Sequence, residues 1–446
     1  LDTPAGRARG YWSTIHVRVS PSNRYMIWLI ARNTISFFSD TYLVIYYKMR
    51  NVTQLLYYHS SPILVLVCTT LFVFRNWFAG TYSWDDNVSI PDHYIRSYLL
   101  NHAIRGGSYY PQWFNDLYYG YGYPLLLFTP PAPIYLISLF SLFIDSHLLL
   151  SIKVVGALSA LCGGIGTYAF VCEHRGRHIG LLSGILYISS PYPFIINIYV
   201  RGAIPEAIAL AALPWMFFYF VKVFSLRNDS FINSYCFIIT IVMILLTHNI
   251  SSLISLLLII FYLGLQWVSS YKILFHRVQL YDIVRIVLIF LVVLLSGMSY
   301  VYGIYINYTG IQLDLASTLF NKSYFLHEES SIGTIPIGIF DWNYSRLLLS
   351  TDNATPVGFY APIFILCGAS CIALLFSPAS ERTLSRNISV IFMIIVLFLM
   401  FLCTSDSVWI YDNFTYLKFI QFPWRLHGPI YLLVAIITGL SAPRIV

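Results

Sequence analysis

Long apolar stretches alternate with short polar ones along most of the chain. Such a stretch can form a helix that satisfies its own backbone hydrogen bonds in lipid. The pattern predicts about ten membrane-spanning helices, over 62–79, 148–171, 179–195, 207–224, 232–247, 250–269, 286–305, 357–376, 388–404 and 426–442. The predicted fold class is therefore an all-α polytopic membrane protein.

The apolar run over 125–144 differs from the others because Pro130, Pro131 and Pro133 interrupt it. Only residues 134–144 remain uninterrupted, and as a helix they would be roughly 16 Å long, about half a bilayer. We therefore expect an interfacial or re-entrant helix here, not a span.

The charges of the loops support this choice. If 134–144 does not span, the loops of one side are short and basic, which is typical of the cytoplasmic side. Their basic residues are Arg175, Arg177, Lys222, Arg227, Lys272, Arg277, Arg285, Arg382 and Arg386. The opposite, external side then receives the long loops 80–147, 196–206, 306–356 and 405–425. We expect a multi-pass protein of the plasma membrane with a cytoplasmic N-terminus.

The two ends of the sequence are unusual. Residues 1–48 are polar or weakly apolar, and Met49 precedes a clean span, so that it resembles a natural start. We predict an N-terminal extension over 1–61, cytoplasmic or interfacial, and a transmembrane domain over 62–446. Because the sequence stops directly after a hydrophobic segment, we expect this domain to be truncated.

Composition excludes several classes of protein. Only 10% of the residues are charged and 58% are hydrophobic, whereas soluble domains have roughly 25% charged residues. The net charge of +7 comes mostly from loops, and no basic tract is interleaved with aromatics, so we predict no nucleic-acid partner. The seven cysteines form no CxxC motif and no spacing typical of zinc ligands or a disulfide framework.

The first external loop is the segment richest in chemistry. Asp85, Asp86, Asp92 and His93 lie within nine residues of one another. Such a group can supply a general base or bind a divalent cation. The alternative is a solvated loop in which an aspartate caps a helix.

Further polar residues lie at the predicted outer ends of spans. Arg201 and Glu206 flank one span, His248 interrupts an apolar stretch, and Arg425 enters the last span. Charges this close to hydrocarbon are costly, so they are usually paired or functional, although an arginine can also snorkel to the interface. If these groups converge with the aspartates of the first loop, they suit a ligand with an anionic head and an apolar tail, such as a lipid phosphate.

Several motifs together resemble a known family. The first loop contains Asp92-His93, Arg96, Gly106-Gly107, Tyr110-Pro111-Gln112-Trp113, Gly120-Tyr121-Gly122-Tyr123-Pro124 and Pro130-Pro131. Arg201-Gly202-Ala203, Glu206, His248-Asn249 and Gln421-Phe422-Pro423-Trp424-Arg425 follow in order. Over roughly 60–430, the chain resembles the bacterial and archaeal membrane proteins labelled 6-pyruvoyl-tetrahydropterin synthase-related, which are similar to GT-C glycosyltransferases.

The resemblance implies a GT-C-like fold and a sugar donor carried on polyprenyl phosphate. It makes Asp92 the first candidate for the catalytic carboxylate and Asp86 the second, although Ser89 stands where we expect an acid in relatives. Arg201 and Arg425 would bind the phosphate, with His93, Glu206 and His248 beside them. No cofactor is implied, apart from an optional divalent cation.

A non-catalytic role is the alternative hypothesis. The chain would then be a subunit of a larger membrane complex, bound to other membrane proteins and to lipids, or a lipid or glycan transporter. Transporters commonly show internal repeats and ionisable residues near the bilayer midplane. We find no clear repeat and almost no charge within the spans, which disfavours transport.

Overall fold

A computed structural model describes residues 58–79, 90–144, 147–224, 231–274, 384–403, 405–420 and 423–442, with a few positions within 287–305 and 368–372. The chain divides into two units, Leu1–Ser61 and Pro62–Val446. The labelled helices described below lie in the second unit. The part of the chain that the structure describes contains no β-strand, only an isolated bridge between Phe114 and Tyr123.

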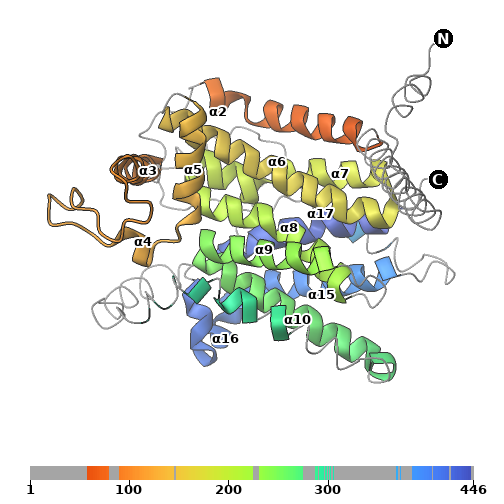
Figure 1. Cartoon of the computed structure of the whole chain (residues 1–446). Coiled ribbons are helices and arrows are strands. Elements are labelled where there is room, and N and C mark those ends of the chain that lie inside the picture. The colour runs from red at the N-terminus through yellow and green to blue at the C-terminus, as the bar shows by residue number, and fades with distance from the viewer. Residues whose placement is uncertain are drawn as a thin grey trace, which may run out of the picture. The chain divides into compact units, whose positions relative to one another are not determined.

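The second unit is built around a bundle of apolar helices (Figure 1). Its members are α6 (Leu148–Arg175), α7 (Arg177–Ile188), α8 (Ile204–Phe224), α9 (Phe231–Thr247), α10 (Asn249–Leu274), α15 (Leu384–Leu402) and α17 (His427–Ser441). The long helix α6 packs against both α7 and α8, while α17 packs against α15, α7 and α6. Their contacting faces form one continuous hydrophobic core.

Glycines allow the closest of these contacts, between α6 and α7. A Cβ at Gly184 would lie 2.8 Å from the carbonyl oxygen of Gly164, and one at Gly180 would lie 2.8 Å from that of Tyr168. Without a hydrophobic driving force between helices in lipid, small residues at such spacing let backbones approach and gain van der Waals contact. The pair of helices therefore depends on glycine at these positions.

Among the residues that the structure describes, three helices are long and apolar enough to cross a membrane, Leu148–Arg175, Arg177–Tyr199 and Ile204–Phe224. Shorter apolar helices over Tyr58–Val73, Phe231–Thr247, Asn249–Leu265, Arg386–Leu402 and His427–Ser441 occupy other predicted spans. The predicted spans 286–305 and 357–376 lie largely outside the described residues. The helical, apolar character of a polytopic membrane protein is thus confirmed, whereas the number of spans and their orientation stay predictions.

The segment between the first span and α6 forms a small subassembly at one end of the bundle. It contains α3 (Ile90–Arg105), α4 (Leu125–Phe128) and α5 (Ala132–Phe143). Figure 1 shows α3 end-on while α6 runs across the view, so α3 lies crosswise to the spans. The twelve-residue α5 begins directly after Pro130 and Pro131, because proline is tolerated only in the first turn of a helix.

A loop over residues 106–124 joins α3 to α4. Phe114 and Tyr123 exchange two backbone hydrogen bonds of 3.0 Å, and the ring of Phe114 is buried with Leu100, Leu125 and Leu126. The Tyr135 hydroxyl of α5 donates to the Tyr109 carbonyl across 2.6 Å. The loop is therefore held by its own backbone pairing and by contacts with α3, α4 and α5.

Candidate functional site

The candidate site is built around a short turn between a π-helix, Pro191–Val200, and α8. Only residues 201–203 lie outside the two helices, so much of the predicted second external loop, 196–206, is helical. Gly202 has φ +62°, a left-handed conformation in which side chains other than glycine are strained. This turn brings Arg201 back over the first turn of α8, where Glu206 lies.

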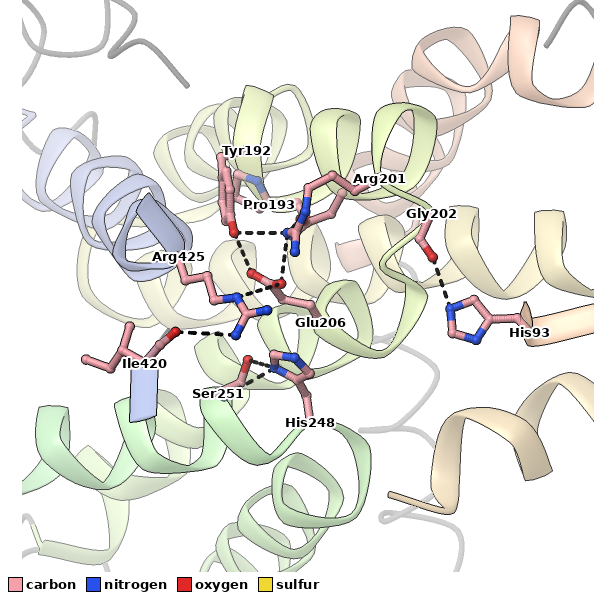
Figure 2. A network of polar contacts seen from close by, with 11 residues as sticks. His93, Tyr192, Pro193, Arg201, Gly202, Glu206, His248, Ser251, Ile420 and Arg425 are labelled. Atoms are coloured by element: carbon pink, nitrogen blue, oxygen red, sulfur yellow. Dashed lines mark hydrogen bonds and ion pairs between the residues drawn. The ribbon is translucent and has the colours of Figure 1, made fainter. Parts of the chain in front are cut away.

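Glu206 is the centre of the site and is only 2% exposed. Its Oε1 accepts a hydrogen bond of 2.6 Å from the Tyr192 hydroxyl, and its Oε2 accepts one of 2.9 Å from Arg201 (Figure 2). A buried ionised carboxylate without hydrogen-bond donors has a large desolvation energy, so these donors are required for its ionised state.

The π-helix and the residue directly after it bring three polar side chains together. The hydrogen bonds of a π-helix join residues five apart, so Tyr192 and Asn197 lie about one turn from each other. Arg201 follows the last residue of the helix, and its backbone N–H donates to the Ile196 carbonyl. Arg201 donates to the Tyr192 hydroxyl across 3.1 Å and also to the Asn197 side chain. The guanidinium is thereby fixed by three acceptors, and burial is more than offset by Tyr192 and Glu206, which raise the pKa of Arg201 above its ordinary value.

Arg425 reaches the same carboxylate from a different part of the chain. It lies in a short 3₁₀-helix, Pro423–Leu426, directly before α17. Its Nε is 4.0 Å from Glu206 Oε2, and its Nη1 donates to the Ile420 carbonyl across 3.3 Å. The Cys403 thiol donates to the Pro423 carbonyl across 3.3 Å and so attaches this segment to the end of α15. Two arginines from distant segments therefore share one carboxylate.

His248 joins the site from the junction of α9 and α10. Its Nδ1 accepts hydrogen bonds from the backbone N–H and hydroxyl of Ser251, so the ring proton lies on Nε2. Burial, opposed by Glu206 and reinforced by Arg425 and Arg201, lowers the pKa of His248 to about 4. The imidazole is therefore neutral at pH 7.

His93 connects α3 to the same turn without entering the Glu206 cluster. Its buried Nε2 donates to the Gly202 carbonyl across 3.1 Å (Figure 2). Burial, together with the charge of Arg96, lowers the pKa of His93 to about 4, so that it is a neutral donor. The contact holds α3 beside the residue that follows Arg201.

Asp92 lies in the first turn of α3, next to His93, and its half-exposed carboxylate forms an ion pair with Arg96 one turn later. The helix N-terminus also favours a negative charge there. Asp92 therefore approaches the site through its neighbour His93 and makes no contact with the Glu206 cluster among the interactions that the structure describes. Asp85 and Asp86 lie outside the described residues.

Of the residues selected from the sequence, Arg201, Glu206, Arg425 and His248 come together, and His93 and Asp92 border them. Sequence reasoning missed Tyr192 and Asn197. Tyr192 lies between two prolines that interrupt an apolar run, and Asn197 follows at the end of that run; these interruptions are the signal that could have identified them.

The charges of the cluster do not cancel. Two guanidinium groups and one carboxylate, with a neutral His248, leave one net positive charge in a largely buried place. Such a charge favours a bound anion, and guanidinium groups suit the oxygens of a phosphate. Within the described ranges, no group of three or more His, Cys, Asp or Glu residues is close enough to hold a metal ion.

Comparison with solved structures identifies a similar fold. The archaeal oligosaccharyltransferase AglB from Archaeoglobus fulgidus, solved in complex with an inhibitory peptide and a dolichol-phosphate, matches with a TM-score of 0.50 and 13% sequence identity. The match covers 86% of this chain and 50% of the AglB chain, so the chain spans about half the length of that protein. No family model matches the sequence, and no curated protein matches it.

The fold and the apolar helices thus define an all-α polytopic membrane protein with a GT-C-like architecture. The GT-C resemblance expected from the motifs is supported by this neighbour. The narrower resemblance to the 6-pyruvoyl-tetrahydropterin synthase-related proteins stays a prediction.

Proposed function

We propose that the protein is a membrane glycosyltransferase of the GT-C type, which moves a sugar from a polyprenyl-phosphate carrier to an acceptor on the extracytoplasmic side. The observation that carries the proposal is the pair of arginines, Arg201 and Arg425, that meet at the buried carboxylate of Glu206. Their net positive charge matches the phosphate of the carrier, and the apolar helices around them suit its isoprenoid tail.

The chemistry follows from this assignment. The acceptor oxygen attacks the anomeric carbon, the bond from that carbon to the phosphate oxygen breaks, and the configuration inverts. Asp92, or Asp86, takes the proton of the acceptor hydroxyl. Arg201 and Arg425 stabilise the negative charge that develops on the departing phosphate, and the Nε2 proton of neutral His248 supplies a further donor to it.

Two residues position these groups in the proposal. Glu206 holds the two guanidinium groups in one place despite their mutual repulsion, and His93 holds α3, with Asp92, beside the turn that carries Arg201. A dolichol-phosphate is bound in the AglB structure, which supports a polyprenyl-phosphate ligand for this fold.

The binding step is tested with purified protein in nanodiscs and a radiolabelled polyprenyl phosphate. We expect Arg425→Gln to weaken binding by tenfold or more. Arg75→Gln changes an exposed arginine that contacts Phe72, one turn before it, and should have no effect. Equal binding by Arg425→Gln and the unaltered protein would contradict the assignment.

The chemical step is tested by Asp92→Asn and Asp86→Asn, alone and together, in an assay of sugar transfer from a polyprenyl-phosphate donor. We expect the double variant to bind donor normally and to lose turnover by at least about a hundredfold, the usual contribution of a general base. Unchanged turnover in the double variant would remove the proposed mechanism.

A further inference from the structure

The loop between α3 and α4 has an aromatic surface that the proposed chemistry does not use. Six aromatic side chains within it are about half exposed or more. They are Tyr109, Tyr110, Trp113, Tyr118, Tyr119 and Tyr121. Exposed apolar patches mark interaction sites when they are contiguous and large, so this concentration of exposed rings in one loop is worth testing as such a site.

The rings stand on a fixed scaffold. The backbone pairing of Phe114 with Tyr123 closes the loop, and the Gly122 N–H donates to the Leu117 carbonyl across 3.0 Å. The Trp113 indole lies directly on Gly122, where no Cβ would fit. The Tyr118 ring packs against Tyr123 with centroids 5.0 Å apart. The loop backbone and the rings of Trp113 and Tyr118 are therefore expected to lose little conformational entropy when a ligand stacks on the loop.

The backbone at Tyr118 and Tyr119, the tip of the loop, is strained. Tyr118 and Tyr119 have φ values of +52° and +60°, the left-handed region that glycine and asparagine adopt at lower cost. Tyr119 is fully exposed, so no packing of its ring compensates for the strain. Strain of this kind persists at functional sites, and here it turns a tyrosine ring outward.

The position and the charge of this loop indicate which class of ligand its rings bind. Figure 1 shows the loop projecting beyond α3 and α4 at the end of the bundle, away from the helices that would lie in lipid. Residues 106–124 contain no lysine or arginine and a single acidic residue, Asp116, so the loop favours an uncharged ligand. Tyrosine combines an aromatic face, on which the C–H face of a pyranose ring stacks, with a hydroxyl that hydrogen-bonds to sugar hydroxyls.

The loop is also linked to the candidate site. Tyr123 packs near Phe128, whose carbonyl accepts a hydrogen bond of 3.1 Å from the Tyr300 hydroxyl. The same hydroxyl pairs with the side chain of Asn249, which follows His248. The base of the aromatic loop is therefore connected, through Phe128 and Tyr300, to the residue next to His248.

From these observations, we infer that the aromatic loop is a binding surface for an uncharged saccharide, which stacks on the rings of Trp113, Tyr119 and Tyr121. This surface deepens the proposed function, since a glycan there is the natural acceptor for the transferred sugar. The binding itself does not require that the protein be a transferase.

The inference is tested by saturation-transfer NMR on the protein in nanodiscs, which avoids sugar-based detergents. The probes are maltotetraose, cellotetraose, chitotetraose and a mannotetraose, with a sialylated tetrasaccharide as the charged comparison. We expect a signal from at least one neutral probe, located on its ring C–H protons, and a weaker one from the charged probe. Absence of signal from all the neutral probes would overturn the inference.

The variants separate the loop from the rest of the molecule. We expect Tyr119→Ala and Tyr121→Ala each to weaken binding by about fivefold to tenfold, whereas Tyr98→Ala, an exposed tyrosine of α3, leaves it unchanged. Equal weakening by Tyr98→Ala would overturn the inference. Quenching by brominated lipids that is lost in Trp113→Phe would also overturn it, because it would place the loop in the bilayer.

The two proposals fail separately. Arg425→Gln is expected to lose polyprenyl phosphate and to keep the saccharide signal. If the saccharide binds but no variant affects phosphate binding, the transferase proposal fails and the loop assignment stands. If phosphate binding depends on Arg425 and no saccharide binds, the loop assignment fails and the transferase proposal stands.

Discussion

The Arg201 guanidinium donates to the Glu206 carboxylate across 2.9 Å, between two side chains that the protein largely hides from solvent. A buried ion pair is not in itself strongly stabilising, because desolvation offsets the attraction. Removing one partner is different, since it leaves the other charge buried without its counter-ion. In the proposed function, this pair keeps a positive charge in place for the phosphate of the carrier.

The first prediction concerns Glu206→Gln. The two arginines would lose their shared carboxylate, and we expect unfolding to become easier by about 3 kcal/mol, the scale of removing one partner of a buried pair. Melting in detergent measures this loss. Inorganic phosphate should stabilise the variant more than the unaltered protein, because the charge of the two guanidinium groups is then no longer offset by a carboxylate. Equal stabilisation of both proteins would contradict the proposed anion site.

The second prediction concerns pH. Because the pKa of His93 is about 4 in the folded protein and about 6.5 when unfolded, the unfolded state binds more protons between these values. Folding stability should therefore be complete above pH 6.5 and should fall as the pH decreases toward 4. His248, with its pKa also about 4, adds to the same loss. The melting temperature measured from pH 8 to pH 4 checks this.

The matched variant for this prediction is His93→Gln, which can still donate to the Gly202 carbonyl but cannot titrate. We expect its melting temperature to depend less on pH than that of the unaltered protein. A profile of identical slope would mean that His93 does not contribute to the acid sensitivity.

The third prediction concerns the packing of α7 on α6. A Cβ at Gly184 would meet the carbonyl of Gly164 at 2.8 Å and the Leu66 side chain at 3.0 Å, so Gly184→Ala should cost about 1 to 3 kcal/mol of stability. At Gly264 in α10, nothing lies within 4 Å of the added Cβ, and Gly264→Ala should be neutral or slightly stabilising. Melting of the two variants side by side measures the difference. Similar losses in both would show that helix contact does not depend on this glycine.

The helices were the part of the structure that the sequence predicted best. An apolar run satisfies its own backbone in lipid, so α6, α8 and α17 follow from local composition alone. The short α5 followed equally from its prolines. The π-helix did not, because its wider turns are set by the packing of Pro191–Val200 against α6 and α8 and not by a periodic pattern.

The site was accessible only in part. Arg201 and Glu206 lie five residues apart in the sequence. They could be selected because a charged side chain near hydrocarbon carries a high desolvation energy. That Arg425 shares the same carboxylate follows from the tertiary fold, in which α17 packs against the π-helix. The bonding of His93 to the Gly202 carbonyl was equally inaccessible, since a backbone acceptor leaves no signature in the sequence. The phosphate role that the sequence suggested for His93 stays a prediction.

The last prediction separates strain from function in the aromatic loop. Asparagine tolerates the left-handed region better than tyrosine does, so Tyr119→Asn should stabilise the protein by up to about 1 kcal/mol. The same change removes a fully exposed ring and should weaken saccharide binding by about fivefold or more. A variant that is more stable yet binds less well is what a strained, ligand-presenting tyrosine requires. Melting and saturation-transfer NMR on one preparation measure both effects, with Tyr98→Asn as the control, because Tyr98 lies in a helix and has no strain to relieve. If Tyr119→Asn loses stability, or gains it without any loss of binding, the ring is not held in this conformation for a ligand.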